Sequence, residues 1–265
     1  MSDVGACAVH VSRDPDAAEV AVVTIDFPSR RNAFSLAIRQ ALHAELDRLM
    51  YLDSSCRAIV LTGAGRAFCA GGDISEMKER TVLESRDRSR LAVSIFELMT
   101  TGPKPMVAAV EGPAMGAGLA LAAACDIVVA SREARFCAAF VRVGVMPDTG
   151  LYWSLPRRVG AGRAKQLMMT GREFGGEEAL RLGFADQVVE PGGALAAACI
   201  QARRYLAIPP VAQAHIRVTL AKGATSLDQA IETEADLQPL MRRSQDHKEA
   251  VAAFMEKRKP VFAGN

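Results

Sequence analysis

The sequence predicts an α/β protein built on a mostly parallel sheet, followed by a helical region. Apolar, β-branched runs of strand length recur through the first 190 of the 265 residues, and segments with helical spacing lie between them. Strands that alternate with helices favour parallel pairing. After about residue 190 only helical segments follow. We therefore expect two regions, residues 1–191 and residues 192–265.

The elements of the first region can be assigned in order along the chain. Residues 20–27 are almost wholly apolar, which is typical of a strand covered on both faces. Ser35 precedes a helical stripe and is placed to cap its N-terminus; the stripe consists of Ile38, Leu42, Leu46 and Leu49. Further buried strands are expected at residues 58–62, 105–110 and 126–130, with a buried helix of small residues at 115–124.

The second region reads as four helices punctuated by proline and glycine, at residues 192–206, 210–222, 227–243 and 245–257. Their content of Leu, Ala and Met exceeds what a solvated appendage needs. We expect them to pack on the body of the protein or on another subunit.

Composition argues against several classes of protein. A formal charge of +2 provides no overall field for nucleic acid or membrane. No run of about 18 apolar residues occurs, and Met1 to Ala6 do not resemble a secretory signal. Six scattered cysteines without a CxxC pair are typical of reduced thiols in a cytoplasmic protein. Without an HExxH motif, we expect no metal site.

Two glycine-containing segments follow predicted strands and are suited to presenting backbone amides. The first runs from Arg66 to Asp73 and contains Gly71 and Gly72, and the second runs from Glu111 to Gly118 and opens the small-residue helix. Amides at a helix N-terminus favour an anion. One amide from each segment would make an oxyanion hole, although each segment alone also reads as an ordinary tight turn.

Other loop motifs do not fit these segments. The second segment lacks the GK[ST] ending of a P-loop, and Leu121 stands where a GxGxxG motif requires glycine. No GxSxG motif occurs, which disfavours a serine hydrolase of the α/β-hydrolase kind.

The sequence resembles the enoyl-CoA hydratase/isomerase (crotonase) superfamily over nearly its whole length. Single matching segments are weak signals, but their order along the chain is specific. The segments are residues 28–34, 67–74, 110–118, 125–128, 143–150, 155–160, 171–174, 179–189 and 254–260.

The resemblance implies a crotonase-like spiral of ββα units with a C-terminal helical trimerisation region, assembled as a homo-trimer or hexamer. It places the oxyanion hole at the amides of Gly72 and Ala117. The substrate would be an acyl-CoA thioester, with coenzyme A entering as part of the substrate and no separate cofactor. The CoA site would be lined by Ser29, Arg30, Arg31, Ala70, Asp73 and Ile74. The two arginines could meet phosphates, or they could be solvated surface charge.

The sequence departs from the hydratase pattern at two positions. Hydratases of the superfamily use two glutamates, and the matching positions here are Ala120 and Phe140. Neither side chain can transfer a proton, so efficient hydration by that mechanism is not expected. Phe140 would instead line the acyl pocket.

Asp148 occupies a place where isomerases of the superfamily carry an acidic residue. Isomerisation of a 3-enoyl to a 2-enoyl thioester needs one shuttling base, and a carboxylate facing the apolar Phe140 could serve as both base and acid. Asp148 could instead cap a helix starting at Leu151. We expect the catalytic role.

Alternatives on the same scaffold stay open. They include hydration, decarboxylation, dehalogenation and thioester hydrolysis, each through a stabilised enolate or a related oxyanion. A non-catalytic acyl-CoA-binding homologue is a further alternative, which the retained Asp148 disfavours.

Overall fold

The apolar runs of the first region form one six-stranded sheet with the order β1-β2-β3-β4-β6-β9. The computed structural model describes residues 7–79 and 81–264. The prediction about a secretory signal rests on residues 1–6, which lie outside the described part. In the sheet β1 pairs antiparallel with β2, and every other pair is parallel, as predicted. Its strands are β1 (Ala8–Asp14), β2 (Ala17–Asp26), β3 (Ala58–Gly63), β4 (Met106–Val110), β6 (Ile127–Ser131) and β9 (Gln187–Val189).

A second sheet of three short strands was not predicted. Its order is β5-β7-β8, with β5 parallel to β7 and β7 antiparallel to β8. Strands of three residues leave little periodicity to detect. They are β5 (Pro113–Met115), β7 (Arg135–Cys137) and β8 (Glu173–Gly175).

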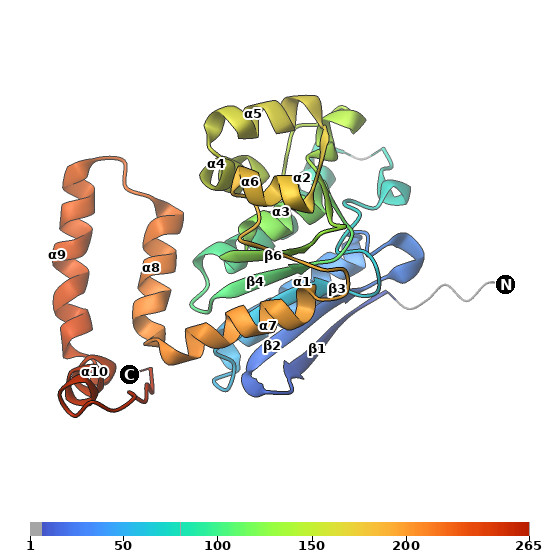
Figure 1. Ribbon diagram of the computed structural model, residues 1–265. Coiled ribbons are helices and arrows are strands. Elements are labelled where there is room, and N and C mark those ends of the chain that lie inside the picture. The colour runs from blue at the N-terminus through green and yellow to red at the C-terminus, as the bar shows by residue number, and fades with distance from the viewer. Residues whose placement is uncertain (1–6, 80, 265) are drawn as a thin grey trace.

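Helices cover both faces of the large sheet (Figure 1). Ser35 caps α1 as expected, accepting a hydrogen bond from the amide of Ile38. All eight residues of α3 are buried, so the prediction of a buried small-residue helix is confirmed, although it begins at Ala117 rather than at residue 115. The helices of this part are α1 (Leu36–Asp47), α2 (Val82–Thr101), α3 (Ala117–Ala124), α4 (Leu151–Val159), α5 (Ala161–Thr170) and α6 (Gly176–Leu182).

The C-terminal helices are close to their predicted ranges, but they do not form one region. They are α7 (Ala194–Arg204), α8 (Pro210–Lys222), α9 (Leu227–Arg243) and α10 (Gln245–Met255). Ala198 and Ala202 of α7 are fully buried in a core cluster with β2, β3 and β4. A division at residue 191 would therefore cut through the core, because α7 covers one face of the large sheet.

The helices beyond α7 project to one side of the body (Figure 1). Helix α8 is anchored by Arg217, whose Nε donates to the Asp126 carboxylate at 2.9 Å and whose guanidinium also donates to the carbonyls of Met99 and Gly102. Helix α9 buries no residue in the single chain. None of the helices within the described ranges is long and apolar enough to cross a membrane.

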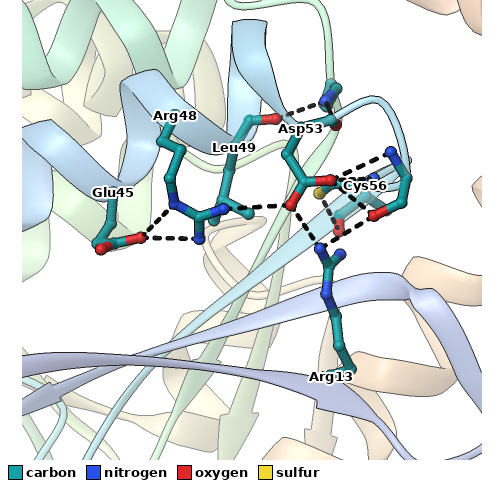
Figure 2. Close-up of polar contacts among 9 residues, drawn as sticks. Arg13, Glu45, Arg48, Leu49, Asp53 and Cys56 are labelled. Carbon is teal, nitrogen blue, oxygen red and sulfur yellow. Dashed lines mark hydrogen bonds and ion pairs between the residues drawn. The ribbon is translucent and has the colours of Figure 1, made fainter.

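The connection from α1 to β3 is held by Asp53 (Figure 2). Its carboxylate accepts hydrogen bonds from the Ser55 hydroxyl at 2.6 Å and the Ser55 amide at 3.1 Å. It also pairs with Arg13 of β1 at 2.5 Å and with Arg48 at 3.3 Å. Asp53 thus links the end of the first helix to the edge strand of the sheet.

Asp53 should make stability depend on acid. The Ser55 hydrogen bonds and the Arg13 charge lower the pKa of its carboxyl from 3.8 to about 2. The pKa of this carboxyl is lower in the folded than in the unfolded protein. The stabilisation is therefore complete well above pH 3.8, and it is lost as the pH falls towards 2. The two arginines are partly in solvent, so we expect Asp53→Asn to cost on the order of 1 kcal/mol at neutral pH. Urea unfolding at several pH values measures this difference, and a difference independent of pH would contradict the assignment.

Candidate active site

The two glycine-containing segments, 45 positions apart along the chain, meet beside the small sheet. Cys69 forms a parallel bridge with Ala114, and the amide of Met115 donates to the carbonyl of Cys69 at 2.9 Å. A Cβ placed on Gly71 would stand 3.9 Å from the amide nitrogen of Ala117. The segments predicted to supply one amide each therefore lie side by side.

Glycine is required at two points of this junction. Gly71 has φ +96, and a Cβ there would stand 2.8 Å from the carbonyl oxygen of Met115. At Gly118 a Cβ would stand 2.2 Å from the carbonyl oxygen of Cys69. Any side chain at either position would push the two segments apart.

The amides of Gly72 and Ala117 have no acceptor among the residues that the structure describes. Ala117 is the first residue of α3, where amides have no partner inside the helix. The helix dipole adds partial positive charge at the same point. The pair of amides is thus suited to hold an oxygen that gains negative charge during a reaction.

The Cys69 thiol sits in the same junction without a nucleophilic role. Burial raises its pKa to about 11, which leaves the thiol protonated at neutral pH.

Asn32 attaches the predicted CoA loop to the first glycine-containing segment. Its side chain is fully buried, accepts from the Phe27 amide at 2.9 Å, and donates to the carbonyls of Ala64 and Ala67 at 2.9 and 2.7 Å. Asn32 also adopts φ 59, a left-handed conformation that asparagine tolerates. The sequence motif contained this residue, but its linking role is visible only in the fold.

The residues predicted to line the CoA site are brought together at this loop. Ser29 and Arg31 are exposed, and the Ala70 amide donates to the Arg31 carbonyl at 3.0 Å. Ile74 is 71% exposed. Arg30 is not simply solvated, because its Nη1 lies 3.2 Å from Asp73 Oδ1.

Among the residues predicted to line the CoA site, Asp73 stabilises the backbone turn that follows it. Burial opposes its ionisation, but hydrogen bonds from Ser75 and the charge of Arg30 outweigh that effect, so its pKa is lowered. The same oxygen accepts from the Ser75 amide at 2.9 Å and from the Ser75 hydroxyl at 2.7 Å. Asp73 thereby shapes the turn that follows Gly72.

Phe140 and Ala120 stand at the positions of the two hydratase glutamates. Phe140 lies at the junction of the two segments, and Ala120 lies in the core. The ring of Phe140 stands 3.9 Å from the point where a Cβ would lie on Gly116, the N-cap residue of α3. Ala120 is fully buried on the first turn of that helix. Neither position offers a proton-transferring group.

Asp148 lies on the loop before α4 and is exposed in the single chain, rather than enclosed beside Phe140 as expected. Its Oδ1 accepts from the Thr149 hydroxyl at 2.9 Å. The N-cap of α4 is Gly150, and no side chain caps that helix. The alternative assignment of Asp148 as a helix cap is therefore wrong.

Nothing specific in the sequence pattern points to Arg39, which lies beside Gly72, or to the ion pair of Glu76 with Arg88. Arg39 Nη2 stands 4.0 Å from the Cβ position of Gly72. Glu76 accepts from the Leu36 amide at the start of α1 and pairs with Arg88 of α2. The one hint in the sequence is that Arg39 adjoins the apolar stripe of α1. Arginines in such positions are also typical of ordinary surfaces.

Comparison with known proteins agrees with this geometry. Residues 16–265 match the family model described as enoyl-CoA hydratase/isomerase. A probable enoyl-CoA hydratase of Rhodobacter capsulatus is 37% identical, with 96% of this chain and 98% of that protein covered. The 1,2-epoxyphenylacetyl-CoA isomerase of Escherichia coli (strain K12) is also 37% identical, with 92% of this chain and 95% of that protein covered.

A solved structure gives the same result for the fold. The crystal structure of an enoyl-CoA hydratase from Polaromonas sp. JS666 superposes with a TM-score of 0.90 at 30% identity, covering 97% of this chain and all of that one. With a family model that spans nearly the whole chain and relatives of matching length, this protein belongs to the enoyl-CoA hydratase/isomerase family and acts on CoA thioesters.

Proposed function

We propose that the protein is an isomerase that shifts the double bond of a 3-enoyl-CoA thioester to the 2-position. The observation that carries this proposal is the pair of Gly72 and Ala117 amides, which have no acceptor among the described residues, together with the retained loop carboxylate of Asp148 and the lack of a carboxylate at positions 120 and 140. One carboxylate is enough for a proton shuttle, whereas the family's hydration mechanism uses two.

The proposed reaction moves one proton from C2 to C4 and shifts the double bond, with no net gain or loss of atoms or electrons. The Asp148 carboxylate removes a proton from C2, and the electron pair moves onto the thioester oxygen, forming a dienolate held by the two amides. The protonated carboxyl then returns the proton at C4. The C3–C4 double bond is thereby replaced by a C2–C3 double bond conjugated with the thioester, and Asp148 is regenerated.

The CoA moiety would lie along the Ser29–Arg31 and Ala70–Ile74 segments. Arg31 is exposed and has no side-chain partner in the described part of the chain, so it is available to a phosphate. Arg30 uses Nη1 for its contact with Asp73, and its other donors could still reach a phosphate. Coenzyme A remains attached to the substrate throughout, and no further cofactor is needed for these steps.

Hydration is the second candidate, because the names of most relatives favour it. Besides the Rhodobacter capsulatus protein, a short-chain-enoyl-CoA hydratase of Clostridium acetobutylicum is 37% identical. The relative named an isomerase is similar to this chain to the same degree, 37%. Names therefore do not separate the two reactions, and the absence of carboxylates at Ala120 and Phe140 supports the proposal of isomerisation.

A side-by-side assay tests the proposal. Purified protein is given 3-enoyl-CoA and 2-enoyl-CoA of equal chain length, and absorbance of the conjugated thioester is followed. Isomerisation raises the absorbance with the first, and hydration lowers it with the second. Turnover of 2-enoyl-CoA that matches or exceeds that of 3-enoyl-CoA would reject the proposal. Thiol release and a malonyl-CoA control detect hydrolysis and decarboxylation.

We further propose that α8, α9 and α10 form the trimerisation region of a spiral of ββα units. Two units support the repeat, because β4-β5-α3 and β6-β7-α4 each run from the large sheet through the small one into a helix. Apolar side chains on the projecting helices are more than half exposed in the single chain. They include Ile216, Leu220, Leu227, Ile231, Leu240 and Phe254.

This surface predicts an oligomer. A patch of this kind is unfavourable in water unless another subunit covers it. Light scattering at micromolar concentration should give three or six times the chain mass of 28.3 kDa. A Leu240→Glu and Phe254→Glu double variant should shift the assembly to smaller species, with Lys165→Glu on the exposed face of α5 as a charge control. A stable monomer of the parent would rule the prediction out.

A cytoplasmic location remains a prediction, and it rests on the cysteines being unpaired. All six cysteines are free, and five of them are buried.

A further inference from the structure

Thr149, the residue after the proposed base, adopts an unfavourable backbone conformation. Its φ is 52, in the left-handed region that a β-branched residue rarely occupies. Hydrogen bonds hold the chain on both sides of it, because the Asp148 carbonyl accepts from the Leu151 amide and the Gly150 carbonyl accepts from the Ser154 amide, each at 3.0 Å. Conformations of this kind persist only where the surroundings enforce them, and they are frequent at functional sites.

Gly150 fixes the same loop to helix α2. Its φ is 75, and a Cβ there would stand 2.3 Å from the ring of Phe96. Any side chain at this position would push the loop away from α2. The backbone around Thr149 is thus held by contacts in which the Asp148 carboxylate takes no part.

The Thr149 side chain is buried, although Asp148 beside it is exposed. Thr149 is only 3% exposed, and its Oγ1 donates to Asp148 Oδ1 at 2.9 Å. Within residues 7–79 and 81–264, Asp148 Oδ2 forms no hydrogen bond or ion pair. The two oxygens of this carboxylate therefore differ, since one is held by a fixed hydroxyl and the other is unpaired.

We propose that Thr149 is a positioning residue whose hydroxyl holds Asp148 Oδ1, so that Oδ2 makes both proton transfers. The inference rests on the proposed function, in which Asp148 shuttles the proton from C2 to C4. An exposed carboxylate on a loop has many orientations, whereas the shuttle must serve both carbons from one place. Small displacements of a reacting group cost much of the rate. A buried hydroxyl on a fixed backbone supplies the orientation that the shuttle needs.

A double-mutant cycle with 3-enoyl-CoA tests this role. Thr149→Val keeps the shape and the β-branch of the side chain but removes the hydroxyl. It should lower kcat by about tenfold or more, because the carboxylate loses its fixed orientation, with KM changed by less than about threefold. Thr149→Ser keeps the hydroxyl and should recover most of the loss. Thr149→Val combined with Asp148→Asn should be no slower than Asp148→Asn alone, because both changes act on the same step.

Controls separate this role from a structural one. Thr170→Val makes the same chemical change at an exposed threonine of α5 and should leave kcat unchanged. Butyryl-CoA affinity by calorimetry and thermal unfolding establish that each variant is folded and binds its ligand. If Thr149→Val does not fold, Thr149→Ala takes its place in the cycle.

The outcomes distinguish the inference from the function on which it rests. If Asp148→Asn is impaired but the two losses multiply in the double variant, Thr149 does not act through Asp148 and the inference is overturned alone. A Thr149→Val enzyme with parental kcat or only a raised KM, or a Thr149→Ser enzyme as slow as Thr149→Val, overturns it in the same way. A parent without isomerase activity, or an Asp148→Asn enzyme as active as its parent, overturns both.

Discussion

Replacing Asp148 by Asn should abolish most isomerase activity, with a loss of about 10²- to 10⁴-fold in kcat. Asparagine has almost the same shape as aspartate but cannot accept and return a proton. Steady-state rates with 3-enoyl-CoA measure the loss. Because Asp148 is exposed on its loop and its side chain caps no helix, the change should leave the fold and butyryl-CoA affinity nearly unaltered.

A matched control is Asp236→Asn, which makes the same chemical change at an exposed carboxylate on α9. That variant should keep the parental rate. Solvent exchange adds a second readout, because the exposed Asp148 carboxyl can exchange its proton with deuterium oxide before returning it, so deuterium should appear at C4 with the parent and not with Asp148→Asn. Parental activity in the Asp148→Asn protein would remove the residue from the mechanism.

Deleting the Ala117 amide should lower turnover by roughly 10²-fold or more, which is the usual cost of one oxyanion donor. Ala117→Pro makes this deletion directly. Proline is well tolerated at the first position of a helix, where its missing N–H breaks no intrahelical bond. Ala117 occupies that position in α3. The loss should appear in kcat, because the amide acts on charge that develops only during the reaction.

The matched control for this substitution is Ala161→Pro. Ala161 is the first residue of α5 and also follows a glycine at the N-cap, but it lies on the exposed surface. It should fold and turn over like the parent. A folded Ala117→Pro enzyme with parental kcat would show that the oxyanion is bound elsewhere.

Much of the architecture is determined by local sequence pattern. The apolar runs correctly predicted β2, β3, β4 and β6, since a strand covered on both faces has few polar positions. Ser35 and the stripe behind it predicted α1 and its cap. The glycines around positions 71 and 118 indicated two close backbone approaches, which the fold contains. The missing glutamates at Ala120 and Phe140 are likewise a property of the sequence.

Other features were decided only by tertiary structure. Periodicity in the sequence indicates which residues are buried, but it does not indicate which residues they pack against. Nothing local indicates that the Gly71 loop lies against the amide of Ala117, or that α7 packs on the large sheet. The Arg30–Asp73 pair joins residues 43 positions apart. Arg39 reads as a surface residue until the fold places it beside Gly72. Such contacts depend on the path of the whole backbone, so they appear only when the chain is folded.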